Sequence, residues 1–452
     1  MATPGSGTYR VLARVGMHTK AYEAQCAAEQ GRHPAAAPPT PRKGLTLLAL
    51  ALGTFAIGTG EFASSGVIQL LASGMDVSVP VAAYAITGDA LGAVTGLLAT
   101  TLRAARASRR TVLLGAIGLF LIGNVLSALA PNIAVLIVSR FVTGSVQGAF
   151  IGAGAGVAAY VYGPGEGGRA FGTVMSGLTV ATVIGAPLGT LVGQHAGWRV
   201  TYWAVVVVGL LAGAALLAWL PRTDDLRVGR VAPELGPLRR LDVRLMVGVA
   251  ALGSASLFAV YTFIGPLVTD AAGASASLIP VALAVFGLGM AFGNYHGGPA
   301  ADRYGNRPMI FGYSNALVHL VAIGLTGSNI LILLPALFGV GASLMYALPT
   351  AQVLLTRLGP DAPSLMGALN LVALDLASSL GATGGAVVLG LGWGTLSTVW
   401  AGSVLTAAGL ILYGAVAART KRADTVRPGP LHCEPGRFRR RGRTITYRRG
   451  FR

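Results

Sequence analysis

The feature that most constrains this chain is a series of apolar runs that recurs from Leu45 to about residue 418. Each run has about twenty residues, enough for a helix to cross a hydrocarbon core of about 30 Å. Of all residues, 53% are hydrophobic and only 11% are charged, whereas soluble domains carry about 25% charged residues. The mean hydropathy is +0.66. The chain is therefore predicted to be an all-α membrane protein.

The loops between these runs alternate in charge. The runs predict twelve transmembrane helices, at 45–69, 80–102, 111–130, 133–159, 169–194, 199–220, 245–268, 276–300, 308–327, 329–355, 364–390 and 395–418. Loops before the even-numbered helices carry almost no Lys or Arg, with Arg199 at a helix start as the exception, whereas the other loops are basic. By the positive-inside rule, the basic loops and both termini are predicted to be cytoplasmic.

The longest basic stretch divides six helices from six. The sequence thus predicts two pseudo-symmetric six-helix bundles, and Ala105–Arg110 echoes Asp302–Arg307 at related places in them. The predicted regions are a disordered cytoplasmic N-terminal extension (1–43), an N-terminal bundle (44–220), a cytoplasmic linker (221–244), a C-terminal bundle (245–418) and a basic cytoplasmic tail (419–452). The alternative for the extension is that the true start of the protein is Met17.

The tail has twelve Lys or Arg residues against Asp424 and Glu434. It either contacts anionic lipid headgroups or is an unstructured tail that strengthens the topology. The formal net charge of +18 does not indicate nucleic-acid binding, because no soluble domain interleaves basic and aromatic residues. The sequence has no P-loop, nucleophile elbow or metal-ligand cluster, so neither an enzyme nor a cofactor or metal site is predicted.

A Gly-rich segment ends the predicted eighth helix. Its sequence, Gly297 to Pro308, is similar to the loop motif of the major facilitator superfamily, G-x-x-x-D-R-x-G-x-R. A tight glycine turn there would let Asp302, Arg303 and Arg307, around Gly305, pair with neighbouring helix termini as a switchable cytoplasmic latch. The alternative is a turn that only sets the topology.

The predicted fifth helix contains Gly185-Ala186-Pro187-Leu188-Gly189, which resembles the superfamily's antiporter motif. Pro187 removes a backbone hydrogen bond and bends the helix, while Gly185, Gly189 and Gly193 provide a flat face for a partner. This motif is expected to take part in conformational gating. Proline and glycine also occur in ordinary membrane helices. The alternative to the antiport interpretation is therefore an ordinary helix of this kind.

Residues 45–418 as a whole resemble the drug:proton antiporter branch of the superfamily, which includes arabinose-efflux-like and chloramphenicol-resistance-like permeases. Arg140, Gly144 and Gly148 match an Arg followed by spaced glycines in the family's fourth helix, and the resemblance implies a role for Arg140 in coupling. The chain departs from the family pattern at Ala105 and Ser108 in the first loop motif, at Asp89, often aromatic, and at Asp375, often Asn.

Four charged residues fall well inside the predicted helices: Glu61, Asp89, Arg140 and Asp375. A charge at the bilayer centre is costly, so such side chains usually face a cavity or a partner. Glu61 and Arg140 are predicted to form a cavity pair, either proton-coupling or permanently structural. Asp89 is either a coupling residue or a hydrogen-bonded group near a kink. Asp375 is either a second coupling site or a structural partner of Asn370 and Ser378.

Polar residues in the same helices are candidates for lining a substrate pocket, namely Gln147, Asn124, Asn370 and Tyr261. We expect a monomeric multi-pass protein of the bacterial inner membrane, with lipids, protons and a small organic molecule as partners. The favoured function is proton-coupled efflux, driven by the proton gradient without a cofactor. The alternatives are an importer or uniporter of a sugar or metabolite, and a membrane sensor without transport.

Overall fold

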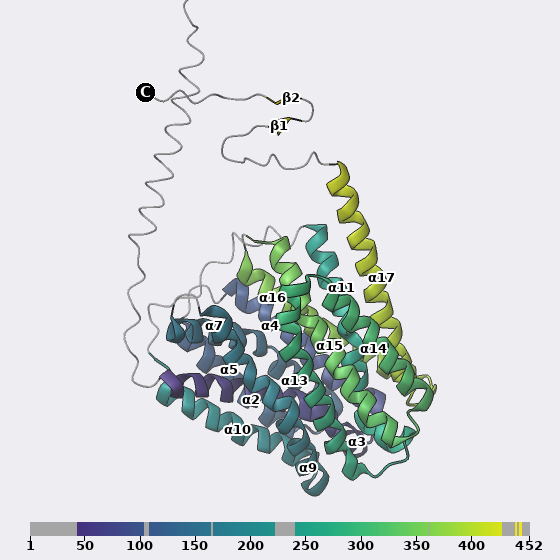
Figure 1. Ribbon diagram of the computed structural model, residues 1–452. Helices are drawn as coiled ribbons and strands as arrows, with labels where there is room; N and C mark the ends of the chain where they lie inside the picture. Colours follow the sequence, from purple (N-terminus) through teal and green to yellow (C-terminus); the bar gives the residue numbers. More distant parts are fainter. Residues whose placement is uncertain are drawn as a thin grey trace, which may run out of the picture.

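The computed structural model describes residues 43–103, 108–163, 166–221, 240–360, 362–426, 439–440 and 443–444. Within these ranges the chain is nearly all helical (Figure 1). The predicted extension at 1–43, except Lys43, lies outside the described residues. So do residues 222–239 of the predicted linker and most of the predicted tail.

The first half begins with α2 (Lys43–Gly66), which α3 (Ile68–Gly74) continues. A bend of 117° then separates α3 from α4 (Val79–Arg103). The remaining elements are α5 (Arg109–Ala128), α6 (Ile133–Gly144), α7 (Gln147–Tyr162), α8 (Gly167–Val180), the π-helical turn η2 (Ala181–Gly185), α9 (Ala186–Ala196) and α10 (Trp198–Trp219). The side chains of Ser108 and Asn132 cap α5 and α6 by accepting bonds from Thr111 N and Val135 N.

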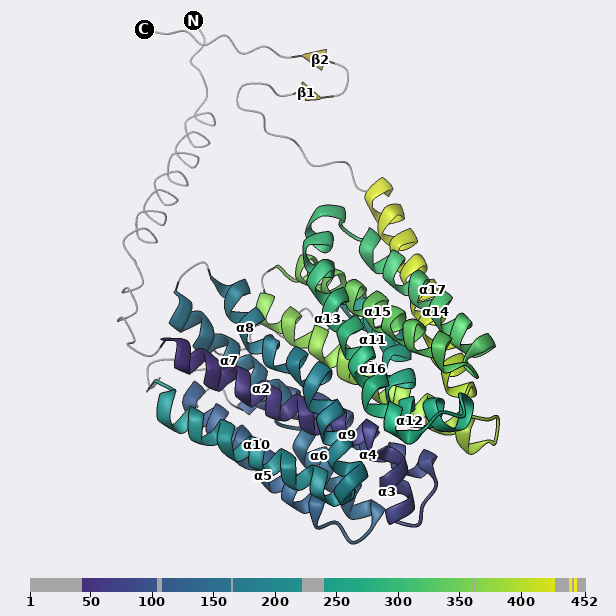
Figure 2. The ribbon, with the colours of Figure 1, turned by 60° about the horizontal axis from the view of Figure 1, so that its bottom comes forward.

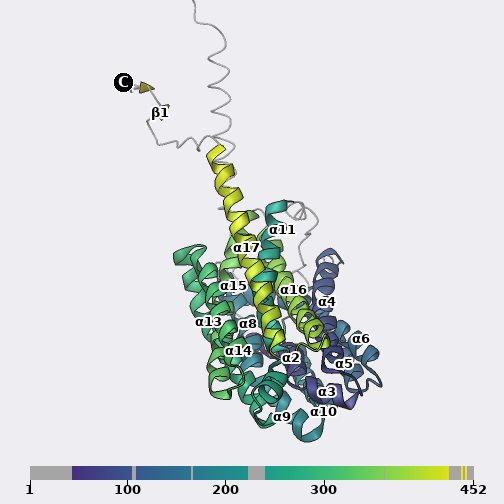
Figure 3. The same cartoon turned by 90° about the vertical axis from the view of Figure 1, so that its right-hand side faces the viewer.

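The second half repeats this arrangement. It consists of α11 (Leu241–Tyr261), the short turns α12 (Ile264–Pro266), η4 (Leu267–Ala271) and η5 (Ala276–Leu278), then α13 (Ile279–Tyr304), α14 (Arg307–Thr326), α15 (Ile330–Leu358), α16 (Pro363–Gly390) and α17 (Ser397–Val426). The last helix extends past the ends of its neighbours (Figure 3). Two strands of two residues, β1 (Arg439–Arg440) and β2 (Arg443–Thr444), pair antiparallel beyond it.

The described chain has eleven spans that are long and apolar enough to cross a membrane, and twelve when the bent pair of α3 and α4 counts as one. Every predicted range coincides with one of these spans. The sequence-based prediction of a twelve-helix membrane protein is therefore confirmed. Large apolar side chains such as Leu211, Val318 and Ile411 are exposed on the outer surface, where lipid is the expected solvent.

Each half has a buried cluster made mainly of its own residues, with Phe62 and Ala186 of the first half joining that of the second, and the two halves lie side by side (Figure 2). In the first half, Leu50, Leu113 and Phe150 belong to one cluster. In the second half, Leu257, Tyr313 and Leu344 belong to another.

A third cluster joins the halves at one end of the molecule, which we call the junction end and define by the loops at 75–78, 129–132, 272–275 and 391–396. Here Val67 and Ile68 of the first half share a core with Phe263, Ala382 and Ala386 of the second. Three sets of hydrogen bonds cross nearby: Gln69 Nε2 donates to Thr269 Oγ1 (2.9 Å), the Thr87 and Thr383 hydroxyls bond to each other (3.1 Å), and Gln194 Nε2 donates to the Ala276 carbonyl (2.7 Å). The halves are thus closed against each other at this end.

Candidate transport site

A buried ion pair joins two helices of the first half. Arg140 Nη2 on α6 lies 2.8 Å from Asp89 Oδ1 on α4. The two residues are 1% and 5% exposed. The helices approach closely because Gly144, one turn after Arg140, packs against the backbone carbonyl of Asp89, where any Cβ would collide. The glycine that follows the arginine therefore positions its partner.

Further hydrogen bonds hold this pair. The Thr143 hydroxyl lies 2.8 Å from Asp89 Oδ1 and 2.7 Å from the Arg140 carbonyl, and it can donate to either. Arg140 Nη2 also donates to the carbonyl of Gly60 on α2 at 3.1 Å. The guanidinium therefore connects α4, α6 and α2, immediately beside Glu61.

Glu61 lies next to this pair without joining it directly. Its half-buried side chain is within electrostatic range of Asp89 and Arg140, and Gln147 is within hydrogen-bonding reach. Among the described residues, Glu61 Oε2 has no hydrogen-bond partner, and neither do Arg140 Nε and Nη1. The sequence analysis expected Glu61 to pair with Arg140. The direct ionic partner of Arg140 is instead Asp89. The reason is the close α4–α6 contact at Gly144, which sequence spacing alone does not reveal.

Asp375 approaches the same region from the second half. It lies on α16, which packs along α4 of the first half, and it is within electrostatic range of both Glu61 and Asp89. Its side chain is 7% exposed, and within the described ranges it has no ion pair or hydrogen bond. The four charged residues predicted from sequence therefore gather where the two halves meet.

The four predicted pocket residues fall into two groups. Gln147, the first residue of α7, and Tyr261, the last of α11, both neighbour Glu61. Asn370 is buried on α16 with its Oδ1 unpartnered in the described structure. Asn124 donates to the Phe120 carbonyl at 2.9 Å within its own helix, and no described contact joins it to Glu61.

Comparison with known proteins places this arrangement in a family. The sequence pattern of the Major Facilitator Superfamily matches residues 50–382. This chain belongs to the major facilitator superfamily. The inner membrane transport protein YdhP of Escherichia coli is 33% identical over 380 residues, which cover 84% of this chain and 97% of that protein. A chloramphenicol resistance protein of Streptomyces lividans is 32% identical over 375 residues, covering 81% and 95%.

The putative transporter AraJ of Escherichia coli is 30% identical over 392 residues, covering 84% of this chain and 97% of AraJ. Among solved structures, a bacterial homologue of the human lysosomal transporter Spinster, inward-facing and unoccupied, has a similar fold with a TM-score of 0.67 at 15% identity. That match covers 86% of this chain and 99% of the other. These relatives establish a membrane transport protein of the major facilitator superfamily and not an enzyme.

The superfamily's loop motif lies at the end of the molecule opposite the junction end. Gly305 ends α13 with a φ of +64°, a conformation that favours glycine. The Arg303 guanidinium lies 5.4 Å from the centre of its neighbour's ring, that of Tyr304. Within the described ranges, Asp302, Arg303 and Arg307 form no ion pair. The predicted glycine turn is present, and the three charged groups are exposed.

The superfamily's fifth-helix motif produces a break in the helix. The π-helical turn η2 ends at Gly185, and Pro187 lies in the first turn of α9, where its missing N–H is tolerated. Gly185 and Gly189 pack against Thr59 and Ala63 of α2, so this face joins two helices of the same half. A contact with the second half is on η2, where Gly287 of α13 packs against the Thr182 carbonyl.

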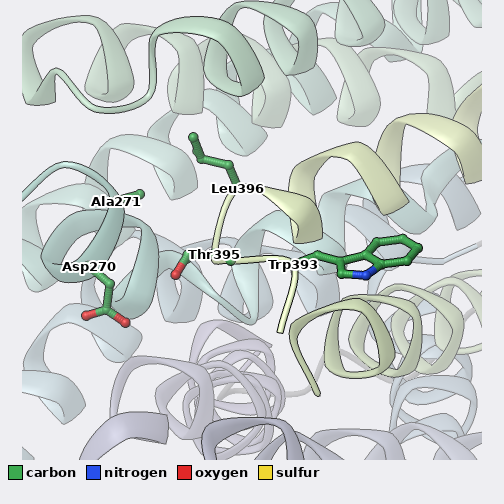
Figure 4. Close-up of a pocket in the computed structure, with 6 residues that line it drawn as sticks. Asp270, Ala271, Trp393, Thr395 and Leu396 are labelled. Carbon is green, nitrogen blue, oxygen red and sulfur yellow. The ribbon is translucent and has the colours of Figure 1, made fainter. Parts of the chain in front are cut away.

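A shallow pocket lies outside the charged site. It has a volume of about 240 Å³ and is lined by residues of η4 and of the loop before α17, namely Asp270, Ala271, Trp393, Gly394, Thr395 and Leu396 (Figure 4). None of these residues belongs to the charged site. Its place at the junction end identifies it as part of the closed end of this major facilitator protein.

Sequence reasoning missed two partners of the charged site. Thr143 holds Asp89, and the Gly60 carbonyl accepts from Arg140. The spacing of Thr143 three residues after Arg140 was a usable signal, since residues three apart share a helix face. A backbone carbonyl leaves no signal in the sequence.

Proposed function

We propose that this major facilitator protein exports small organic molecules in exchange for protons. Membrane transport itself follows from the family and its relatives. The observation that carries the finer proposal is the environment of Glu61. Its carboxylate has an unpartnered buried oxygen, lies beside the Arg140–Asp89 pair and is next to the boundary between the halves.

A carboxylate in this position is suited to exchanging protons. A buried carboxylate and a nearby guanidinium influence each other strongly because little water screens them, and Arg140 binds the Gly60 carbonyl directly before Glu61 in the chain. Small movements that change its distance from Arg140 therefore change which form is preferred. In this proposal Glu61 binds a proton in one state and releases it in the other, with Asp89, Arg140 and Asp375 as the coupling partners.

The direction of transport rests on topology and on one relative. With the predicted topology, the junction end faces outward, so the present state is closed to the outside and receives its substrate from the cytoplasm. The loop motif with Asp302, Arg303, Gly305 and Arg307 then lies on the cytoplasmic side and closes that side in the other state. The resemblance to a chloramphenicol resistance protein favours a small organic substrate that leaves the cell.

We further propose that a single chain performs the cycle in a bacterial inner membrane with the proton gradient as its energy source. The pathway runs between the halves, past Gln147 and Tyr261, which both neighbour Glu61. Gly185, Pro187 and Gly189 allow the fifth membrane span to bend where it meets α2 and the second half.

The test uses proteoliposomes that contain the full chain and a panel of drugs, sugars and nucleosides. Substrate movement and internal pH are recorded together for the wild type, Glu61→Gln and Glu166→Gln. Glu166 is an exposed carboxylate far from the charged site, 4.0 Å from Arg169, and is the matched control.

The proposal predicts that at least one compound moves against its gradient when a pH gradient is imposed, and that it evokes proton movement in the opposite direction. Both effects are lost in Glu61→Gln and kept in Glu166→Gln. Transport that persists without proton movement would instead support a uniporter, with Glu61 as a structural residue.

A further inference from the structure

At the junction end, one contact between the halves is made by residues at equivalent places in the two halves. Gln69 is the second residue of α3, and Gly265 is the second residue of α12, so both follow the break after the first helix of their half. The two residues meet, because a Cβ on Gly265 would lie 3.0 Å from Gln69 Oε1. A glycine in the second half thus leaves the room that the Gln69 side chain fills.

One turn after Gly265, Thr269 and Asp270 receive the amide of Gln69. Gln69 Nε2 donates to Thr269 Oγ1 at 2.9 Å and lies 3.5 Å from Asp270 Oδ1. The Thr269 hydroxyl in turn lies 2.6 Å from Asp270 Oδ1, to which it can donate. Three polar groups from the two halves therefore contact one another, and we call Gln69, Thr269 and Asp270 the junction gate.

The Asp270 carboxylate determines the direction of these hydrogen bonds. A carboxylate only accepts, and a bond to a charged acceptor is stronger than one between neutral groups. The Thr269 hydroxyl also lies 3.2 Å from the Gly265 carbonyl of its own turn, but the carboxylate is closer and charged. With its proton directed to Asp270, the Thr269 oxygen accepts from Gln69. The same negative charge favours the Nε2 end of the Gln69 amide over the Oε1 end.

The junction gate lies between water and the apolar cluster that joins the halves. Asp270 is exposed and lines the shallow pocket at this end (Figure 4), whereas Gln69 and Thr269 are half-buried. Ile68, directly before Gln69, is 1% exposed and belongs to the joining cluster. Among the three sets of hydrogen bonds described between the halves, this set alone has a charged acceptor. The halves cannot separate here without breaking it.

We propose that Asp270 is a positioning residue of the transport cycle, which orients Thr269 so that its bond with Gln69 keeps the junction end closed. Breaking this bond is then a step that precedes opening of the junction end. The role is the same for export and for import, and it requires no proton coupling. The inference therefore goes beyond the proposed function and does not depend on it.

The test measures how fast a buried cysteine at the junction end reacts with a maleimide in the purified full chain in detergent. Ala386→Cys is the reporter, because Ala386 is 2% exposed within the cluster that joins the halves. Cys26 and Cys433, the two cysteines of the sequence, are replaced by serine so that one thiol remains. Since this thiol reacts when the junction end opens, its rate follows the open fraction even where that fraction is small.

In this background, Asp270→Ala, Thr269→Val and Gln69→Ala are each expected to raise the rate about fivefold, because each removes one part of the same gate. Thr269→Ser keeps the hydroxyl and is expected to stay near the parent rate. Thr326→Val is the matched control, since its hydroxyl at the same end bonds at 2.6 Å to the Ala322 carbonyl of its own helix. Thermal unfolding establishes that each variant is folded.

Two further proteins sharpen the result. The double variant Gln69→Ala with Thr269→Val is expected to react no faster than either single variant, whereas adding Gln194→Ala, which removes a separate bond between the halves, raises the rate further. A thiol at Leu391→Cys, 61% exposed at the same end, reports the reactivity of an open site and reacts equally in all variants. The parent rate in a folded Asp270→Ala would overturn the proposal, as would equal rises in Thr269→Ser and Thr269→Val.

The outcome is separable from that of the proposed function. Reaction of the thiol needs neither a substrate nor a gradient, whereas proton movement in proteoliposomes needs both. A protein that moves no protons but shows the expected rates keeps this inference and loses the proposed function. One that exchanges protons while Asp270→Ala reacts at the parent rate keeps the proposed function and loses this inference.

Discussion

The two halves pack the same pair of helices in the same way and differ in the charges that this packing holds. In the first half, Gly88, Gly92 and Gly96 of α4 pack against the carbonyls of Ile137, Phe141 and Ser145. In the second half, Gly289, Gly293 and Gly297 of α13 pack against those of Phe338, Ala342 and Tyr346. The residue numbers of each contact in the second half exceed those of the matching contact in the first half by the same constant.

The same shift places Met290 at the position of Asp89 and Gly341 at the position of Arg140. Gly341 packs against Met290, where an added Cβ would lie 3.4 Å from Met290 Cγ. An apolar contact in one half thus corresponds to a buried ion pair in the other. The comparison teaches that close packing of these helices does not require the charges, and in the proposed function Asp89 and Arg140 act in proton coupling.

The largest expected effect comes from removing the charge of Arg140. Arg140→Met leaves Asp89 buried without its partner, and breaking a buried pair in this way costs about 3–5 kcal/mol. We expect transport to be abolished and the melting temperature in detergent to fall. The double variant Asp89→Asn with Arg140→Met recovers much of the stability and none of the transport. Recovery of transport as well would make the pair purely structural.

A smaller loss of stability, equal in both halves, is expected when these glycines are replaced by alanine. Gly92→Ala and Gly293→Ala each push a methyl group into a backbone carbonyl, of Phe141 or Ala342, and overpacking of this kind costs about 1–3 kcal/mol. Gly298→Ala on α13 is the control, because nothing lies within 4 Å of its Cβ position. Thermal unfolding of the three variants tests whether the two helix crossings are equivalent. A loss of stability in only one of Gly92→Ala and Gly293→Ala would contradict this equivalence.

Thr143→Val separates positioning from packing. The change keeps the shape of the side chain and removes the hydroxyl that bonds to Asp89, at a cost of about 1 kcal/mol. Transport is expected to slow several-fold while the protein stays folded, and Thr143→Ser is expected to restore most of the rate. Equal rates for all three proteins would show that Thr143 does not orient Asp89.

The smallest effect is predicted at the position that corresponds to Asp89. Met290→Leu in the second half exchanges apolar side chains of similar volume, and its effect on unfolding is expected to stay within about 1 kcal/mol. Transport assays should give nearly wild-type rates. Loss of transport in a stable Met290→Leu variant would mean that the second-half crossing has a direct role in the cycle.

The helices themselves were largely predictable from the sequence. Apolar length and loop charge predicted spans that match the observed helices, such as 80–102 for α4 and 111–130 for α5. Breaks within spans were not predicted, for example at 145–146 between α6 and α7. Such breaks depend on tertiary packing rather than on local residue preference, since no proline marks that position.

The composition of the charged site was predictable and its pairing was not. A charged residue in an apolar run stands out, so Glu61, Asp89, Arg140 and Asp375 could be named from sequence. Which of them touch depends on the rotation of each helix and on how closely two helices approach. The ion pair of Arg140 with Asp89 follows from the contact at Gly144, and only the three-dimensional arrangement reveals it.

The most direct test of the account is the release of protons by the purified protein in weakly buffered detergent. The compound identified in the proteoliposome assay is added to saturation, and the pH change is calibrated per molecule of protein. The account predicts release of about one proton by the wild type and none by Glu61→Gln, with Glu166→Gln like the wild type. Equal release by the wild type and by Glu61→Gln would contradict the central role of Glu61 in proton exchange.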